Sequence, residues 1–309
     1  MTSTAISVRG LTKRYGERIA VNGLDLDVPT GVVAGFVGPN GAGKTTTMAM
    51  LLGLVRPTAG TGAVLGRPIG DPASYLPRVG ALIETPAFYP ALTGAENLRM
   101  FATVGRTDPA RIPALLDLVG LAERGDDRYR SYSLGMKQRL GIAAALLGDP
   151  ELLILDEPAN GLDPQGVREM RTLVGRLAEA GRTVLVSSHD LSELEQICDW
   201  LVLIDTGRSI YQGPAREFLD DVGGQLAVVP QCEGDVARLR VVLAEAGCDV
   251  SPDGDDGRLV VRTNGDDDRD LAATVNRRAF DAGIVLVELT PVRSSLEDRY
   301  LSLVEGASR

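Results

Sequence analysis

Residues 38–45 combine glycines, a lysine and a threonine at a spacing that suits the binding of a polyphosphate. The stretch Gly38-Pro39-Asn40-Gly41-Ala42-Gly43-Lys44-Thr45 fits the pattern G-x-x-x-x-G-K-[ST] in full. The apolar run 32–37 before it predicts a buried strand, and residues 46–54 after it predict a helix. A glycine loop between a strand and a helix lets backbone N–H groups converge on phosphate oxygens. Taken alone, the loop also fits an ordinary glycine turn of an α/β protein.

The side chains of this loop have separate expected roles. Gly38, Gly41 and Gly43 allow close approach of the backbone and positive φ where a larger residue would clash. We expect Lys44 to reach the β- and γ-phosphates, and Thr45 to offer its hydroxyl to an accompanying Mg²⁺. The loop therefore predicts a nucleotide triphosphate with its metal.

Two adjacent carboxylates follow the apolar run 152–155. This places Asp156 and Glu157 at the carboxyl end of a predicted strand, the edge at which open α/β sheets bind ligands. Asp156 is suited to holding Mg²⁺, directly or through water. Glu157 is suited to orienting or deprotonating a water aimed at the γ-phosphate. Without the glycine loop, the pair would equally fit solvated turn residues.

Two further residues have two interpretations each. His189, the single histidine, follows the apolar strand 183–188, where it could hydrogen-bond a γ-phosphate or serve only the structure. Tyr15 precedes a turn, where its ring could stack on a purine base or pack on the rim of the sheet.

A second potential anion site opens the apolar helix 140–147. Ser133 and Gly135 lie at its predicted N-terminus, where free N–H groups and the helix dipole favour negative charge. A bare N-cap is the alternative interpretation. The turn 160–163 precedes the next predicted helix, 165–178, and ends at Asp163.

Composition limits the possible partners. The 309 residues include 44% hydrophobic residues and predict about two domains. The net charge is −10, and the segment from Asp220 onward holds 18 acidic and 10 basic side chains, which disfavours a nucleic-acid partner. Cys198, Cys232 and Cys248 are widely spaced, which is typical of buried thiols in a reducing compartment. Residues 1–5 lack the build of a signal peptide, and no apolar run approaches the ~20 residues of a membrane span. We therefore expect a cytosolic chain without a transmembrane segment of its own.

The remaining elements indicate an α/β domain with an appendage. An edge strand is predicted from residue 6, ending in a turn after residue 15, and further strands are predicted at 24–28, 63–65 and 79–84. A turn is predicted at 56–62 and a hairpin at 201–211. Thr93 and Glu96 form a capping box for one helix, and Gly120 ends another that begins near 112. Beyond 220, strands at 226–229, 258–261 and 284–287 alternate with helices at 236–245 and 270–282. We expect residues 1–220 to form one domain, with a helical subdomain at about 85–150, and residues 221–309 to form a small α+β domain.

Taken together, the motifs resemble the nucleotide-binding subunit of an ABC (ATP-binding cassette) transporter over residues 6–220. The resemblance implies a P-loop NTPase cassette of the α/β class, with a mixed sheet core, a β-rich N-terminal part and a helical subdomain. It also implies ATP and Mg²⁺ as ligands. The implied roles are nucleotide binding by Tyr15, Gly38, Pro39, Asn40, Gly41, Ala42, Gly43, Lys44, Thr45 and Thr46; a signature motif with Ser133 and Gly135; a D-loop with Asp163; metal binding by Thr45, Asp156 and Glu84; and catalysis by Glu157 and His189.

Three residues depart from the usual pattern of this family. Leu134 and Met136 stand where the signature usually has glycine and glutamine, and Glu84 stands where a glutamine usually senses Mg²⁺ and the transmembrane partner. These changes, and the tail at 295–301, resemble the drug and antibiotic export branch that includes the daunorubicin and bacitracin exporters. The resemblance implies export of a drug, antibiotic or lipid-like small molecule through a separate permease.

The implied assembly is a homodimer or heterodimer of cassettes, peripheral on the cytoplasmic face of the membrane. Ser133 and Gly135 of one cassette would close on the γ-phosphate bound at Lys44 of the other. A different class is a soluble cassette ATPase that acts on ribosomes or nucleic acid. Such relatives usually carry two cassettes or a long coiled coil, and the acidic balance disfavours polyanions. A cassette that signals without hydrolysis is opposed by Glu157 and His189, but the altered signature keeps it open.

Overall fold

The computed structural model describes residues 3–84, 87–220, 225–252, 257–262 and 268–291, and residue 300. The chain divides into two compact units, the first running to Ala215 and the second beginning at Arg216. Apart from residue 300, the tail stretch at 295–301 lies outside the described residues, as do residues 253–256 and 266–267 of the acidic linkers. Each unit is described by itself below.

The first unit begins with an antiparallel sheet. Its strands are β1 (Thr4–Tyr15), β2 (Arg18–Pro29), β4 (Ala59–Val64) and β5 (Arg67–Pro68), in the order β2-β1-β4-β5. β1 therefore lies between two strands, and the prediction of an edge strand here is wrong. The reason is β4, which has Gly60 and Gly62 where we expected only a turn. A Cβ at Gly62 would lie 2.5 Å from the carbonyl oxygen of Ser7, so the glycine is what lets the two strands approach.

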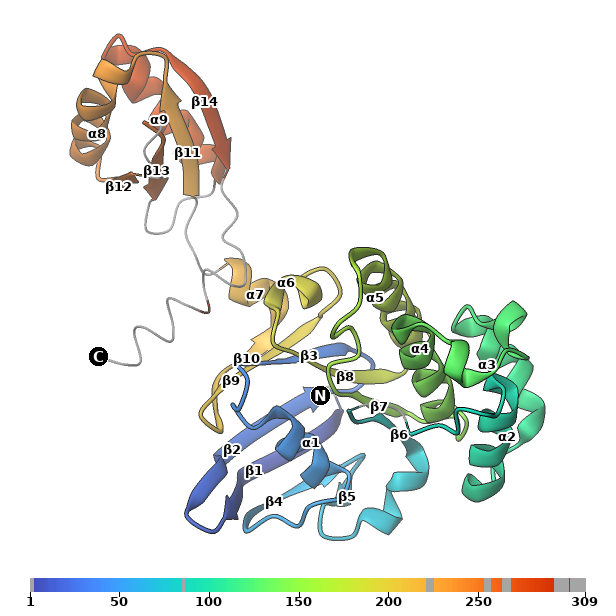
Figure 1. Cartoon of the computed structure of the whole chain (residues 1–309). Helices are drawn as coiled ribbons and strands as arrows, with labels where there is room; N and C mark the ends of the chain where they lie inside the picture. Colours follow the sequence, from blue (N-terminus) through green and yellow to red (C-terminus); the bar gives the residue numbers. More distant parts are fainter. Residues whose placement is uncertain are drawn as a thin grey trace. The chain divides into compact units, whose positions relative to one another are not determined.

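A second sheet forms the centre of the unit (Figure 1). Its order is β10-β9-β3-β8-β7-β6, and β9, β3, β8, β7 and β6 pair in parallel while β10 returns antiparallel to β9. The bounds are β3 Val33–Val37, β6 Val79–Leu82, β7 Leu152–Leu155, β8 Thr183–Ser188, β9 Trp200–Asp205 and β10 Arg208–Pro214. Every residue of β3, β7 and β8 is buried, as expected for inner parallel strands.

The register of these strands brings the candidate residues to one edge. Val37 at the end of β3 pairs with Ser188, and Leu155 at the end of β7 pairs with Val186. The glycine loop follows β3, the two carboxylates follow β7, and His189 follows β8. The carboxyl ends of three neighbouring strands thus place the loop, the carboxylates and the histidine side by side.

Helices complete the unit. Their bounds are α1 Lys44–Leu51, α2 Gly94–Gly105, α3 Ile112–Leu118, α4 Leu134–Ala145, α5 Pro164–Glu179 and α6 Leu191–Leu194. A further helix, α7 (Ala215–Asp220), begins at the last residue of this unit and continues into the second. Short 3-10 helices occupy Pro72–Ser74, Leu76–Arg78, Pro109–Arg111, Ala122–Arg124 and Tyr129–Ser131. The capping box of Thr93 and Glu96 at the start of α2 is confirmed, and Gly120 follows α3 with φ 67°. Figure 1 shows α2, α3 and α4 gathered beside β6 and β7, so the stretch between these strands is largely helical.

The core of the first unit joins both sheets through α1. Its buried residues include Ile6, Leu24, Phe36, Met48 and Ile154. Since a single apolar core connects the N-terminal sheet, the first helix and the central sheet, the loop that precedes α1 is anchored on both sides.

The second unit alternates strands and helices. It runs β11 (Gln225–Pro230), a 3-10 helix (Glu233–Asp235), α8 (Val236–Glu245), β12 (Asp249–Pro252), β13 (Leu259–Arg262), α9 (Asp268–Asp281) and β14 (Leu286–Pro291). Its antiparallel sheet has the order β12-β13-β11-β14, the arrangement of a ferredoxin-like split βαβ fold. Leu239 and Leu243 of α8 and Leu271 and Val275 of α9 share one core with the sheet. The sequence did not predict β12, a short edge strand whose final Pro252 is tolerated only at such an edge.

Among the described residues, none of the helices is both long and apolar enough to cross a bilayer.

Candidate functional site

The glycine loop between β3 and α1 requires its glycines. A Cβ at Gly38 would lie 2.3 Å from the carbonyl oxygen of Ile204, and one at Gly43 would lie 2.5 Å from that of Ala20. Gly41 and Gly43 have φ of 86° and 104°, in the left-handed region that favours glycine. The neighbouring backbone thus leaves no room for side chains at Gly38 and Gly43. The loop can present its N–H groups directly to a ligand.

Lys44 places a buried cation inside this loop. The residue is only 6% exposed, and its Nζ donates to the carbonyl oxygens of Gly38 at 2.6 Å and Pro39 at 3.4 Å. Nζ also lies 3.3 Å from Oε1 of Glu157. A buried ammonium group requires such acceptors, because desolvation without compensation is costly. The lysine is therefore held at the mouth of the glycine loop and next to a carboxylate.

Asp156 is held by two hydroxyl groups. Its Oδ2 accepts from Thr45 Oγ1 at 2.7 Å, and its Oδ1 accepts from Ser187 Oγ at 2.5 Å. Ser187 Oγ also accepts from the backbone N–H of Glu157 at 2.9 Å. Sequence reasoning did not single out Ser187. The signal was available, since parallel pairing of β7 with β8 places the residue after Val186 beside the residue after Leu155.

Glu157 lies between two basic groups. Its Oε2 is 2.6 Å from Nδ1 of His189, and its Oε1 faces Lys44. Its φ of 48° is unusual for a residue with a side chain, and such strain of about 1–3 kcal/mol persists only where the surroundings enforce it. Here the N–H bond to Ser187 and the contacts with Lys44 and His189 fix the residue. The conformation directs a carboxylate toward the mouth of the glycine loop.

These groups line one cavity of about 380 Å³. It contains, of the predicted residues, Asn40, Gly41, Gly43, Lys44, Thr45, Thr46, Glu157 and His189. Arg18 and Ala20 from β2 and Asn160 also line it, and the two β2 residues were not predicted. Gly38, Pro39 and Asp156 reach the site through the hydrogen bonds to Lys44 and Thr45. Ala42 is buried within the loop.

Ser133, Gly135 and Asp163 line a different cavity, of about 350 Å³. Ser133 caps α4 by accepting from the N–H of Met136 at 3.3 Å, and Asp163 caps α5 by accepting from the N–H of Gly166 at 2.8 Å. Two helix N-termini therefore open onto the same space, an arrangement that favours negative charge.

Tyr15 and Glu84 line neither cavity, and no hydrogen bond described above links them to one. Tyr15, at the end of β1, is 49% exposed, and Lys13 Nζ lies 4.8 Å from the centroid of its ring. Glu84 is exposed two residues beyond β6, with φ 57°. Their roles in base stacking and metal binding stay predictions.

The residues of the first cavity fit a nucleotide with Mg²⁺. The glycine loop and Lys44 offer the N–H groups and the cation that phosphates prefer. A threonine hydroxyl beside a buried aspartate is a set of hard oxygen donors, which suits Mg²⁺ rather than a softer metal.

The sequence pattern of the family described as "ABC transporter" matches residues 21–160, and that of a "Domain of unknown function (DUF8746)" matches residues 234–297. The chain is 39% identical to the bacitracin transport ATP-binding protein BcrA of Bacillus licheniformis, over 99% of both chains. It is 37% identical to the daunorubicin resistance ATP-binding protein DrrA3 of Streptomyces coeruleorubidus, over 98% of this chain and 96% of that one. A solved ATP-binding subunit of an ABC transporter superposes with a TM-score of 0.62 at 31% identity, over 70% of this chain and 92% of that chain. With the glycine loop, the two carboxylates and the histidine at one sheet edge, this likeness shows that the chain belongs to the family of ABC transporter ATP-binding proteins.

Proposed function

We propose that this chain is the ATP-hydrolysing subunit of an exporter, and that it drives a drug-like, antibiotic-like or lipid-like small molecule through a separate transmembrane permease. The relatives named for bacitracin transport and daunorubicin resistance support export, because they align with this chain from end to end. The proposal also includes a permease partner and a position at the cytoplasmic face of the membrane, which the same likeness supports.

The position of Glu157 is the observation that best supports ATP hydrolysis by this chain. Its carboxylate stands between Lys44 and His189, at the mouth of the glycine loop. In the proposed reaction, Lys44 and the loop N–H groups bind the β- and γ-phosphates, Glu157 orients a water molecule and accepts its proton, and His189 holds the Glu157 carboxylate and meets the γ-phosphate.

Thr45 and Asp156 are the residues that would hold Mg²⁺. When bound with the nucleotide, the ion neutralises charge on the phosphate oxygens. Ser187 occupies Oδ1 of Asp156, so Oδ2 and the Thr45 hydroxyl, which are hydrogen-bonded to each other, would be the oxygens offered to the ion.

The active form in this proposal contains two cassettes. The Lys44 cavity and the Ser133 cavity share no lining residue in the described part of the chain. Each nucleotide site would therefore be completed by Ser133 and Gly135 of a second cassette. Asp163 lines the same cavity, beside these residues.

Replacement of the proposed base gives the direct test. Glu157→Gln keeps the size and hydrogen bonding of the side chain but removes its basicity. We expect nucleotide affinity within about twofold of wild type and turnover lower by about 10²-fold or more, the usual contribution of a general base. The matched control is Glu151→Gln, which removes a carboxylate from an exposed ion pair with Arg78. Steady-state turnover near the wild-type rate in Glu157→Gln would exclude Glu157 as the base.

The transport part of the proposal has its own test. The tagged chain is purified from detergent-solubilised membranes, and the proteins that accompany it are identified by mass spectrometry. Recovery of a polytopic membrane protein at near-equal stoichiometry is the expected result. Recovery of ribosomal proteins instead would contradict the exporter and favour a soluble cassette ATPase.

A further inference from the structure

We propose that Arg139 is a positioning residue for ATP hydrolysis, which holds the N-terminal end of α4 against α5 and so sets Ser133 relative to Asp163. The inference rests on the proposed function. It concerns neither the phosphate-binding residues nor the base, but a polar junction between three elements that lie apart in the sequence.

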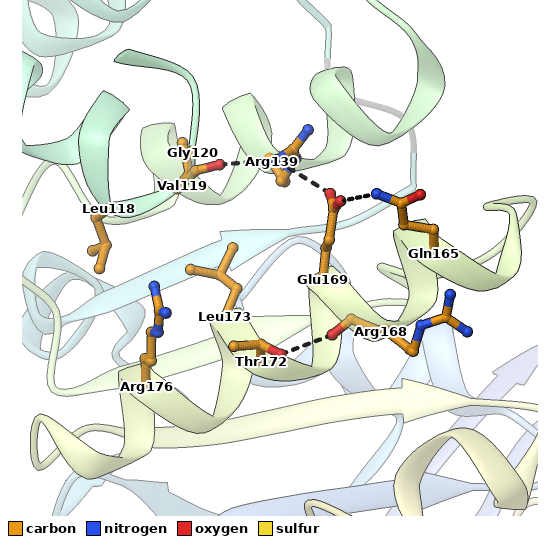
Figure 2. Close-up of a pocket in the computed structure, with 10 residues that line it drawn as sticks. All are labelled: Leu118, Val119, Gly120, Arg139, Gln165, Arg168, Glu169, Thr172, Leu173 and Arg176. Atoms are coloured by element: carbon orange, nitrogen blue, oxygen red, sulfur yellow. Dashed lines mark hydrogen bonds and ion pairs between the residues drawn. The ribbon is translucent and has the colours of Figure 1, made fainter. Parts of the chain in front are cut away.

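The junction is formed by one guanidinium group and three acceptors, and Figure 2 shows two of these contacts, to Val119 and to Glu169. Arg139 Nε faces the carbonyl oxygen of Gly135, one turn back in α4, at 3.4 Å. Its Nη1 lies 3.4 Å from the carbonyl oxygen of Val119 at the end of α3, and 3.4 Å from Oε2 of Glu169 on α5. A planar guanidinium with several fixed donors can serve acceptors in different directions, which a lysine cannot do.

The acceptor on α5 is itself oriented. Glu169 Oε1 accepts from Gln165 Nε2 at 3.0 Å, so one oxygen is used within α5 and the other faces Arg139. Gln165 lies two residues after Asp163, the N-cap of α5. A displacement of Glu169 would therefore be passed to the first turn of α5 and to the D-loop before it.

A cavity lies beside Arg139 and explains why its contacts matter for the spacing of the helices. A cavity of about 350 Å³ separates the end of α3 from α5, and Arg139, Leu118, Thr172 and Arg176 are among its lining residues (Figure 2). Side chains do not fill this hollow, so close packing contributes less to the spacing at this point than in the core. The guanidinium contacts span one side of the cavity instead.

An apolar contact closes the other end of the junction. A Cβ on Gly161 would meet Cδ2 of Leu134 at 3.2 Å, and one on Gly135 would meet Cδ2 of Leu162 at 3.6 Å. The leucine at the unusual signature position thus packs against the D-loop of its own chain. Arg139 and these leucines together place the N-termini of α4 and α5 around one cavity.

The contacts of Arg139 are better suited to positioning than to stability. All three are long, and Glu169 is 43% exposed, so the ion pair contributes little to the free energy of unfolding. Loss of the arginine should therefore leave a folded chain in which the N-terminal end of α4, with Ser133, is displaced. Turnover should then fall while the free energy of unfolding changes little.

The test is a double-mutant cycle on the full chain, with steady-state ATP hydrolysis and thermal unfolding as measurements. We expect Arg139→Gln to lower kcat about tenfold with KM within about twofold, and Glu169→Gln to lower kcat about threefold. If both act through one contact, the double variant should be no slower than Arg139→Gln alone. Arg139→Lys, which keeps the charge but not the fork, should recover only part of the loss. The control Arg9→Gln removes an arginine from the exposed pair with Asp27 and should leave kcat unchanged.

Three results would overturn the inference. One is wild-type kcat in Arg139→Gln, and another is a double variant whose loss equals the product of the two single losses. The third is a fall in kcat of Arg139→Gln that loss of the fold explains. In that case Arg139→Lys would remain folded and keep the full wild-type turnover. Absence of hydrolysis in the wild-type chain would instead reject the proposed function, and this inference with it.

Discussion

Among single residues, Ser187 links two residues of the site, because its one hydroxyl forms hydrogen bonds with both Asp156 and Glu157. It donates to Asp156 at 2.5 Å and accepts from the N–H of Glu157 at 2.9 Å. Ser187→Ala leaves a buried carboxylate oxygen and a backbone N–H without this partner, which should cost about 1–3 kcal/mol of unfolding free energy. We also expect kcat to fall about tenfold, since a shift of Asp156 and Glu157 raises the barrier by about 1.4 kcal/mol.

Urea unfolding and ATP hydrolysis measure the two effects of Ser187→Ala separately. Ser74→Ala is the matched control, because the Ser74 hydroxyl donates only to the carbonyl oxygen of Asp71, away from the site. A Ser187→Ala chain with wild-type kcat would show that Thr45 alone orients Asp156.

Most of the site residues could be predicted because each belongs to a short motif with its own chemistry. The glycine loop, the two carboxylates and His189 each directly follow a strand, and the pairing of these strands in the sheet brings them together. Arg18, Ala20 and Ser187 belong to no such motif. Their places depend on strand register and on the path of β2, which a residue pattern does not encode. Tyr15 was predicted from its position before a turn and Glu84 from the resemblance, and neither lines the cavity.

At the scale of elements, Asp149 links the helical part of the first unit to the central sheet. It lies between α4 and β7 and accepts from Arg111, before α3, at 2.9 Å and from Arg182, before β8, at 2.8 Å. Hydrogen bonds from Arg182, then Arg111, hold the pKa of Asp149 below its usual value. Since the folded-state pKa is depressed, the stabilisation is present above the unfolded value of about 3.9 and is lost as pH falls through the folded value.

Asp149→Asn should therefore lower stability at neutral pH and not in strong acid. Asparagine tolerates the φ of 53°, so the change removes charge without adding strain. Because Asp149 is 62% exposed, solvent screening limits the expected loss to about 0.5 kcal/mol near pH 7, and salt should reduce it further. Urea unfolding as a function of pH checks this, and a difference between the two chains that grows below pH 3 would contradict the assignment.

Elements with local end signals were predicted well, and elements without them were not. α2 begins at its predicted capping box, α8 spans the predicted residues 236–245, and the hairpin of β9 and β10 forms around Thr206 and Gly207. β4 was shortened in the prediction because Gly60 and Gly62 resemble turn residues. β12 was missed because its four residues include a serine and a proline. In both strands tertiary pairing outweighs local propensity, which is weak for short strands.

At the scale of the whole molecule, two separate cores suggest two separately folding domains. The first core joins both sheets of the first unit around α1, and the second joins α8 and α9 to their own sheet. We propose the domain division 1–220 and 221–309. The nucleotide site is built from the first unit alone, so its chemistry should not require the second unit to be intact.

Leu243→Ala tests this independence in the full chain. Leu243 is fully buried on α8, and its truncation should destabilise the second unit by about 2–5 kcal/mol. Trp200, the single tryptophan, packs against the first core, so its fluorescence reports only on the first unit, whereas circular dichroism reports on both. We expect the variant to show an early urea transition by circular dichroism, with the Trp200 transition and the ATP affinity unchanged. Val241→Ala, on the same helix but 57% exposed, should change stability by less than about 0.5 kcal/mol. If the Trp200 transition moved together with the early one, the two units would unfold as a single cooperative body, and the C-terminal domain would be part of the structure that holds the nucleotide site.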